Sequence, residues 1–553
     1  MIGFIAHNMA PLMFGALVVF LLIGYPVAFS LAAIGIFFGL LGIDLGLLQT
    51  TLFQALPQRI WAIMSNDTLL AVPFFTFMGL ILERSGMAED LLDTVGQVFG
   101  PLRGGLAFAV IFVGALLAAT TGVVAASVIS MGLISLPIML RYGYDRRFAT
   151  GVIAASGTLA QIIPPSLVLI VMADQLGRSV GDMYQGAFLP GIGLAVLYAI
   201  YVAIVTVVRP RWAPALPLAA ITIREPGRRA GYGSLIAVVM IAAAAAWALT
   251  EYDILHPIWA CALVGAAAYV VALADKYLKL RILSLMARQV VIVMMPPLAL
   301  IFLVLGTIFL GIATPTEGGA MGSAGALILA LANRRLDWKL LRQAMDTTAK
   351  LSSFVMFILI GSTVFSLVFR GVNGDLWVEH LLTSLPGGQI GFLIVVNTMA
   401  FFLAFFLDFF ELAFIIVPLL GPVAEKLGID LIWFGVLLGV NMQTSFLHPP
   451  FGYALFYLRS VAPSEPYTDR VTNKRLAPLT TGQIYWGSIP FVVIQLIMVG
   501  CIIAFPQLVL ATIETKHFDL NKIQIIAPQI QEGGQGQPEI NPDNPLQPPG
   551  GNN

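Results

Sequence analysis

Polar side chains that could hold an ion or a small solute lie in four short stretches of otherwise apolar sequence. Hydroxyl, amide and carboxylate oxygens can coordinate a cation, and small residues let a ligand approach the backbone closely. The candidate binding residues are Thr120, Thr121, Gly122, Ser127, Ser156, Gly157, Thr158, Asp408, Glu411, Asn441, Gln443, Thr444 and Ser445. Whether they bind anything depends on where the surrounding helices leave backbone groups free.

Two proline pairs interrupt the chain at these stretches. Pro164 with Pro165 and Pro449 with Pro450 remove backbone donors and disfavour a helical residue before them, so SGTLAQIIPP and NMQTSFLHPP are predicted to be unwound within a bilayer. A further break is predicted at Pro315. Irregular backbone at membrane depth is tolerated only where it is buried in protein or lines a cavity, where unwound carbonyls attract cations and helix N-termini attract anions. The alternative is an ordinary proline kink whose hydroxyls bond back to the helix.

Each proline pair follows an apolar segment that is too long for one crossing and has polar residues at its centre. These segments, 104–140 and 391–427, predict two re-entrant helical hairpins with Gly122 at the first tip and Asp408 and Glu411 at the second. Two carboxylates in strongly apolar sequence are costly to bury, so they are usually functional or paired. Alternatively, the second tip emerges at the membrane surface, where both carboxylates are solvated and cap the second helix of the hairpin.

The composition requires a polytopic membrane protein. Hydrophobic residues make up 59% of the chain and charged residues 10%, with a mean hydropathy of +0.91. Apolar spans of the ~20 residues that cross a bilayer recur without the alternation of a barrel strand, so they predict helices. The two cysteines lie in apolar sequence and indicate no disulfide, metal or redox role. Zero net charge argues against nucleic acid and leaves the lipid bilayer as the expected surrounding.

One motif occurs twice, at an offset of 285 positions, in 141–166 and 426–451. The matched pairs are Gly143 and Gly428, Asp145 and Asp430, Phe148 and Trp433, Pro164 and Pro449, and Pro165 and Pro450. The first copy opens with a basic turn and the second with a mixed one, and basic loops stay on the cytoplasmic side. We therefore predict two repeats of inverted topology, each with a re-entrant hairpin and a discontinuous helix, around a site near the bilayer midplane.

The rest of the chain is divided by charge and composition. Basic segments flank 210–290 and predict that both ends of this insertion are cytoplasmic, which puts both termini in the periplasm. The Gln-, Asn-, Pro- and Gly-rich tail is predicted to be largely disordered. The predicted parts are a first repeat over 1–209, with its hairpin at 104–140 and broken helix at 148–173; an inserted module over 210–290 with two transmembrane spans; a second repeat over 291–460, with its hairpin at 391–427 and broken helix at 432–458; a cytoplasmic loop and last transmembrane helix over 461–510; and the tail over 511–553.

Five stretches together resemble the large membrane subunit of tripartite ATP-independent periplasmic (TRAP) transporters, the DctM-like permeases. In order, they are LLAVPFFTFMGLI at Leu69–Ile81, GYD at Gly143–Asp145, AASGTLAQIIPPS at Ala154–Ser166, GIATPTEGGA at Gly311–Ala320 and NMQTSFLHPPFG at Asn441–Gly452. The resemblance implies an elevator-type, ion-transporter-like symporter of the bacterial inner membrane that couples sodium to uptake of a carboxylate. It also implies a small four-helix membrane subunit and a periplasmic binding protein as partners. Sodium at the hairpin tips and unwound stretches would be the only bound metal, with no other cofactor.

Two other functions were weighed against this one. A sodium/carboxylate or other ion symporter that needs no binding protein would use the same inverted hairpins. A membrane-embedded enzyme is less consistent with the sequence, because HExxH, GxSxG and Walker motifs are absent. His448 has no clustered histidine for a metal and is predicted to bond a carbonyl at the second break, with proton sensing as the alternative.

Overall fold

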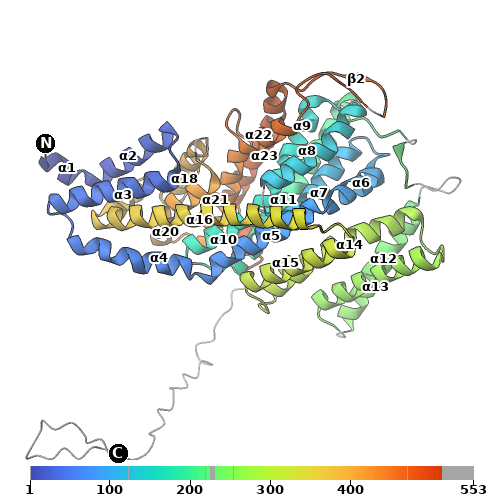
Figure 1. Ribbon diagram of the computed structural model, residues 1–553, viewed down its shortest axis with the longest axis horizontal. Helices are drawn as coiled ribbons and strands as arrows, with labels where there is room; N and C mark the ends of the chain where they lie inside the picture. The colour runs from blue at the N-terminus through green and yellow to red at the C-terminus, as the bar shows by residue number, and fades with distance from the viewer. Residues whose placement is uncertain are drawn as a thin grey trace, which may run out of the picture. The chain divides into compact units, whose positions relative to one another are not determined.

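Over the described part of the chain, the computed structural model is mostly helical, with one pair of two-residue strands (Figure 1). Among the residues it describes, eight helices are long and apolar enough to cross a membrane, or up to ten if two bent pairs each count as one span. The predicted all-α polytopic membrane protein is confirmed, whereas the inverted orientation of the repeats stays a prediction. The described residues are 2–122, 124–217, 220–223, 231–252, 255–405, 407–469 and 471–513.

Eight helical segments precede the first hairpin. Gly24 ends α2 in the left-handed region at φ +88°, and Pro26 stands directly before α3, so the Gly-Tyr-Pro sequence turns the chain between two separate helices. The segments are α1 Ile2–His7, α2 Met9–Ile23, α3 Val27–Asp44, the 3₁₀ turn η1 Thr50–Ala55, α4 Leu56–Met64, η2 Asp67–Leu70, α5 Ala71–Arg84 and α6 Met87–Phe99.

The first hairpin and the first broken helix follow. The hairpin is formed by α7 Gly105–Thr121 and α8 Val124–Arg141, which contact each other. The broken helix consists of α9 Arg146–Thr158, η3 Leu159–Gln161 and α10 Leu167–Gln175. After it come α11 Val180–Val208 and η4 Pro210–Trp212.

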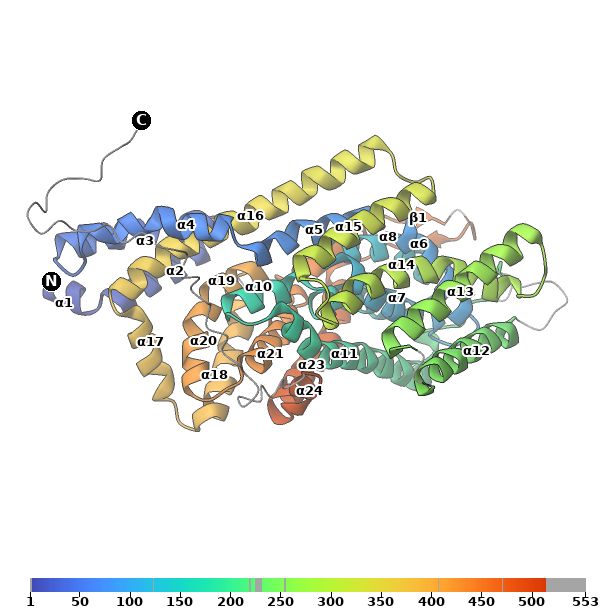
Figure 2. The ribbon, with the colours of Figure 1, turned by 90° about the horizontal axis from the view of Figure 1, so that it is seen from below.

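The middle of the chain contains the inserted module and the longest helix. The module supplies α12 Tyr232–Glu251 and α13 Pro257–Leu278, which pack on each other and on α14 Leu285–Phe309 and lie beside that helix in both views (Figures 1 and 2). Next come α15 Pro315–Ala332, α16 Trp338–Gly371 and α17 Gly374–Thr383. Helix α16 runs along α3 and α5, so segments far apart in sequence form one layer (Figure 2).

The second hairpin and second broken helix complete the fold. The hairpin comprises α18 Gly388–Leu403, α19 Phe409–Ile415 and α20 Val417–Lys426, and the broken helix comprises α21 Leu431–Gln443, η6 Thr444–Phe446 and α22 Tyr453–Val461. The final elements are the antiparallel strands β1 Tyr467–Thr468 and β2 Arg475–Leu476, then α23 Thr481–Ala504 and α24 Gln507–Leu510. Residues 514–553, on which most of the predicted tail falls, lie outside the described residues.

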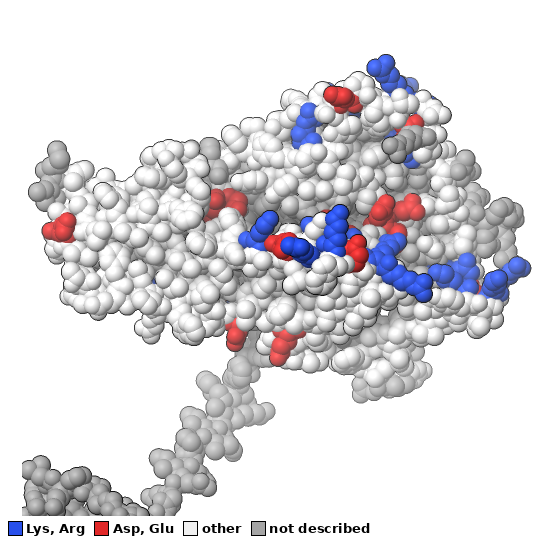
Figure 3. Space-filling model, viewed as in Figure 1, with Lys and Arg blue, Asp and Glu red and all other residues white. Residues whose placement is uncertain are grey.

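The exposed surface is apolar over most of its extent. In Figure 3, charged side chains cover a small part of the face in view and gather mainly in one band. Large side chains such as Trp61, Val207 and Trp247 are at least two-thirds exposed. A soluble protein rarely exposes so much apolar area, which is the kind of surface that a membrane protein presents to lipid.

Candidate functional site

The two broken helices have the same local structure at equivalent positions. Helices α9 and α21 begin and end at residues 285 apart, and so do the 3₁₀ turns η3 and η6 that follow them. In both, the chain then leaves the helix before a proline pair, and both Pro–Pro peptides are cis. The equivalent aspartates cap the two helices: Asp145 accepts hydrogen bonds from Arg147 N and Phe148 N, and Asp430 from Ile432 N and Trp433 N.

A hydrogen bond joins the two broken helices directly. Gln443 Nε2 donates to Thr158 Oγ1 at 3.2 Å, and these two residues are themselves 285 positions apart. When two repeats are related by a two-fold axis, a residue of one repeat can contact the equivalent position of the other only close to that axis. The bond between Thr158 and Gln443 is the contact that such an arrangement would produce.

Further buried polar contacts extend from this bond to neighbouring helices. Thr158 also bonds Tyr198 of α11, whose hydroxyl accepts from Gln495 Nε2 of α23 at 3.0 Å. On the other side, Asn441 Nδ2 of α21 donates to the Asn397 carbonyl of α18 at 2.7 Å. Because an unpaired polar group is costly in a low-dielectric interior, these bonds favour one relative placement of five elements.

The predicted site residues of the broken helices divide into two groups. Thr158 Oγ1 donates to the Ala155 carbonyl at 2.8 Å and Thr444 Oγ1 to the Asn441 carbonyl at 2.6 Å, so both hydroxyls bond back to their own helix. In contrast, Ser156 Oγ, Ser445 Oγ and Gln443 Oε1 are buried without a hydrogen-bond partner among the described residues. Buried oxygens of this kind are rare and are the better candidates for a ligand.

The first hairpin lies directly against the first broken helix. Its tip residue Gly122 has φ +57°, and a Cβ there would lie 3.4 Å from the Pro165 carbonyl oxygen. Gly157 lies at a close approach of α9 to α8, because a Cβ on it would lie 2.4 Å from Val128 Cγ2. Ser127, one residue before this contact, is buried and hydrogen-bonded or otherwise paired. The predicted candidates Thr120 and Thr121 end α7, but their side chains lie outside the described residues.

The second hairpin tip carries a reciprocal cap. Asp408 Oδ1 accepts from Glu411 N and Glu411 Oε2 accepts from Asp408 N, each at 2.9 Å, which is a capping box at the start of α19. The capping role expected in the alternative interpretation is therefore present. The carboxylates are not freely solvated, however, because both residues are only partly exposed.

A cavity of about 330 Å³ forms where the two hairpin tips and the two breaks meet. Of the predicted site residues, Gly122 and Asp408 line it, whereas Ser156, Thr158, Asn441 and Gln443 are buried and do not line it. The remaining lining is Val124, Ala125, Gln161, Leu167, Val168, Leu351, Phe354, Phe409, Phe410, Phe446, Tyr453 and Tyr457. No Lys or Arg side chain lines the cavity within the described part of the chain.

Three polar lining residues were not predicted from the sequence. Gln161 is 3% exposed and its Oε1 has no described hydrogen-bond partner, although the cavity lies beside it. Tyr453 and Tyr457 are on the first and second turns of α22. Gln161 belongs to the same unwound stretch as Ser156 and Thr158, so its place in that stretch is the signal that could have identified it. The tyrosines follow the second proline pair and carry no comparable signal.

Two other sequence predictions have definite structural outcomes. The hydrogen bond expected between His448 and a carbonyl is wrong, because neither ring nitrogen has a partner in the described structure. The imidazole packs instead against Phe401 and Phe405, with ring centroids 4.3 Å from each. Pro315 is the first residue of α15, behind the capping box of Thr314 and Glu317, so this proline begins a helix.

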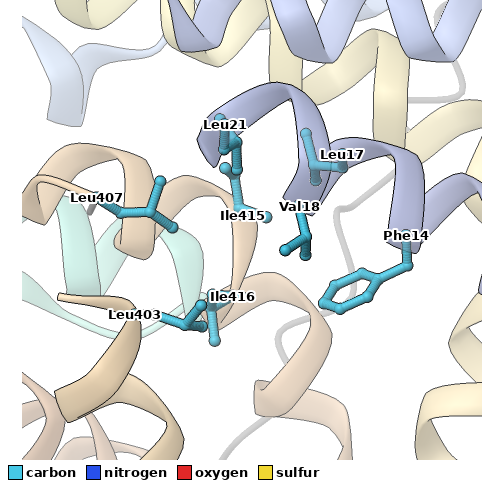
Figure 4. Close-up of a pocket in the computed structure, with 8 residues that line it drawn as sticks. All are labelled: Phe14, Leu17, Val18, Leu21, Leu403, Leu407, Ile415 and Ile416. Carbon is cyan, nitrogen blue, oxygen red and sulfur yellow. The ribbon is translucent and has the colours of Figure 1, made fainter. Parts of the chain in front are cut away.

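A void between α2 and the second hairpin has an entirely apolar lining. Figure 4 shows Phe14, Leu17, Val18 and Leu21 of α2 facing Leu403, Leu407, Ile415 and Ile416 across a small void. A void without polar partners stays dry, so this is a loosely packed apolar seam.

Comparison with known proteins gives the family. The model described as "Tripartite ATP-independent periplasmic transporter, DctM component" matches residues 14–508. A Pseudomonas aeruginosa C4-dicarboxylate TRAP transporter large permease is 27% identical over 74% of this chain and 81% of its own length. A Vibrio cholerae sialic acid TRAP transporter large permease is 25% identical over 88% of this chain and 94% of its own.

Among solved structures, the Alcanivorax borkumensis YdaH transporter covers 83% of this chain and 87% of its own, at 14% identity and a TM-score of 0.47. The family match spans nearly the whole chain, including both hairpins, both broken helices and the cavity between them. The chain therefore belongs to the DctM component family of tripartite ATP-independent periplasmic transporters, and it is a multi-pass transporter subunit of the bacterial inner membrane.

Proposed function

We propose that this chain forms the path by which a small organic acid enters the cell together with Na⁺, and that the solute binds in the cavity between the hairpin tips. The relatives described above are named for C4-dicarboxylate and sialic acid transport, which supports an organic acid as the solute class. As in the three-part systems of its family, it works with a small four-helix membrane subunit and a periplasmic binding protein.

The observation that carries this proposal is the cavity itself. Gln161 supplies an amide whose Oε1 has no described hydrogen-bond donor, Asp408 a carboxylate, and Tyr453 and Tyr457 two hydroxyls, between aromatic walls that include Phe354. An apolar pocket with a few convergent polar groups is the usual form of a small-molecule site. Leu167 and Val168 bring the N-terminal turn of α10 to the same cavity, and helix N-termini favour the anionic group of a solute.

Na⁺ fits the oxygen atoms left at the breaks. Hard cations bind carboxylate, carbonyl, amide and hydroxyl oxygens. Ser156, Gln443 and Ser445 offer unpaired buried oxygens, and the chain outside helices at 162–165 and 447–450 adds backbone carbonyls. Asp408 and Glu411 each use one carboxylate oxygen in the capping box, which leaves the other available.

An elevator movement would carry the hairpins and broken helices, together with α11 and α23, past the remaining helices. The polar contacts among α9, α11, α18, α21 and α23 support their moving as one body. The apolar seam between α2 and the second hairpin is the kind of contact that can slide, because it has no directional bonds to break (Figure 4).

A solute-independent test begins with Na⁺. The purified full-length chain should gain thermal stability in Na⁺ and not in K⁺ at equal ionic strength. Gln161→Ala should keep this sodium effect but lower uptake about tenfold in proteoliposomes that contain the complete system, with a C4-dicarboxylate and sialic acid tested in parallel. Ser30→Ala is the matched control, since this buried hydroxyl of α3 bonds back to Pro26. Equal stability in both salts, or equal uptake without a sodium gradient, would contradict the proposal.

A further inference from the structure

A second concave site lies at the opposite end of the first broken helix from the break. A groove of about 370 Å³ runs between the start of α9, the end of α11 and the start of α23. Two arginines, Arg147 and Arg209, and two tryptophans, Trp212 and Trp486, line it together with apolar side chains that include Ile204 and Val208. Arginine and tryptophan side chains do not line the solute cavity, and these four residues have no part in the proposed transport.

Both arginines are exposed and keep their charge free for a ligand. Neither makes an ion pair with a described carboxylate. The Arg209 guanidinium stacks over the Trp212 ring with 4.2 Å from Cζ to the ring centroid, which holds its plane while leaving its N–H groups available. The nearest acid in sequence, Asp145, does not line the groove, and its carboxylate caps α9 through Arg147 N and Phe148 N.

The apolar part of the groove continues onto the exposed side of α11. Ile204 is 55% exposed and Val208 69%, and Trp486 on α23 is 65% exposed. Tryptophan beside arginine at the end of apolar helices is typical of the level at which a bilayer meets water. The basic turn that begins α9 predicts that this end is cytoplasmic.

We propose that this groove binds an anionic phospholipid of the cytoplasmic leaflet, with its phosphate between Arg147 and Arg209 and an acyl chain along Ile204 and Val208. Guanidinium groups bind phosphate through paired N–H donors, and basic pockets between transmembrane helices bind such head groups. The exposed apolar wall favours a lipid over free phosphate, which would leave that wall uncovered. A protein partner would need acidic side chains opposite the two arginines.

The test uses the full-length chain, delipidated in detergent and titrated with phosphatidylglycerol, cardiolipin, phosphatidylethanolamine or phosphatidylcholine under native mass spectrometry. We expect the two anionic lipids to bind more tightly, and Arg147→Ala/Arg209→Ala to weaken them about tenfold or more. Arg211→Ala is the matched control, because Arg211 is an exposed arginine of the same segment that does not line the groove. The Arg147→Lys/Arg209→Lys variant should keep most of the binding and shows that the fold tolerates change.

A second measurement locates the lipid. Brominated phosphatidylglycerol should quench a part of the tryptophan fluorescence that Trp486→Phe removes, and brominated phosphatidylcholine should not. Equal binding of neutral and anionic lipids, wild-type binding by the double alanine variant, or full competition by inorganic phosphate would each overturn the proposal. If the arginine substitutions leave lipid binding unchanged, the groove is not a lipid site, and a partner helix would be the other occupant to test.

Discussion

Asp408 and Glu411 perform a structural task that does not require their charge. In the capping box each side chain accepts one backbone N–H, and Asn and Gln offer an acceptor oxygen at the same positions. Substitution by Asn and Gln therefore keeps the helix cap while it removes the negative charge. This separation decides between a tip that merely begins a helix and a tip that takes part in transport.

We expect Asp408→Asn and Glu411→Gln to keep the thermal stability of the protein but to lower sodium-dependent uptake or change its pH dependence. Asp408→Ala should in addition cost about 0.5–2 kcal/mol of stability, because it removes the cap. Uptake and thermal unfolding measured on the same preparations give both quantities. Wild-type uptake by the double amide variant across pH and sodium concentration would show that the carboxylates serve only the helix.

For single residues, the sequence indicates which side chains are candidates for a site but not which of them face the cavity. Polar residues near proline pairs could be selected because helix breaks in a bilayer need partners. Which of them would face a cavity depends on tertiary packing: Gln161 does so while Thr158, three residues earlier, bonds Gln443. Sequence spacing alone does not separate these outcomes, since η3 changes the helical period between them.

At the scale of elements, Gly157 sets the distance between the first hairpin and the first broken helix. We expect Gly157→Ala to destabilise the protein by about 1–3 kcal/mol, because its Cβ would lie 2.4 Å from Val128 Cγ2 and 3.1 Å from the Val128 backbone. Adding Val128→Ala should recover part of the loss, so the two changes should not be additive. Gly15→Ala is the control, with open space around the added methyl. With Val128→Ala measured alone to complete the cycle, a Gly157→Ala variant that melts at the wild-type temperature would disprove the contact.

The loop before α23 is fastened to the first hairpin through Asp469. This buried carboxylate accepts from Arg141 Nε at 2.9 Å and from both Thr472 N and Thr472 Oγ1. Burial acts to raise the pKa of Asp469, but the hydrogen bonds from Thr472 and the Arg141 charge outweigh it and lower the pKa to about 2. Since the pKa of Asp469 is lower in the folded protein than in the unfolded chain, ionised Asp469 stabilises the loop fully above roughly pH 4. This stabilisation is lost as the pH falls through about 2.

Asp469→Asn should therefore destabilise the β1–β2 loop at neutral pH by about 1.5–3 kcal/mol, the range for hydrogen bonds to charged groups. Hydrogen exchange of the loop amides, corrected for the intrinsic pH dependence of exchange, measures this loss of stability. The wild-type loop should lose its protection from exchange as the pH falls from roughly 4 to about 2. Glu465→Gln, an exposed acid in the same loop, should leave protection unchanged. Protection that is independent of both Asp469 and pH would refute the role of this ion pair.

For the whole molecule, the charge bias of the equivalent turns predicts their sides of the membrane. With Cys261 and Cys501 replaced, a cysteine at Tyr142 should react with an impermeant reagent only from the cytoplasm, and one at Leu427 only from the periplasm. Both positions are partly exposed, so the labelling rates are comparable. Reaction of both cysteines from one side would exclude inversion of the repeats.

The fold class followed from composition, because continuous apolar spans leave helices as the only spanning elements. In the structure, each proline pair lies in a break between two helices, α9 and α10 in the first case and α21 and α22 in the second. The contact of the inserted helices with α14 was not predictable, since α12 and α13 are apolar all round and their sequence favours no face.

The bond between Thr158 and Gln443 also bears on how the polypeptide is joined. The surfaces that hold the two halves together lie inside the bundle, whereas the covalent link between them passes through α12, which has no buried residue among those described. The chain could therefore be cut between α12 and α13 and made as two polypeptides. Their association would rest on the buried polar bonds and packing between the broken helices, so the permease should reassemble from separately encoded fragments.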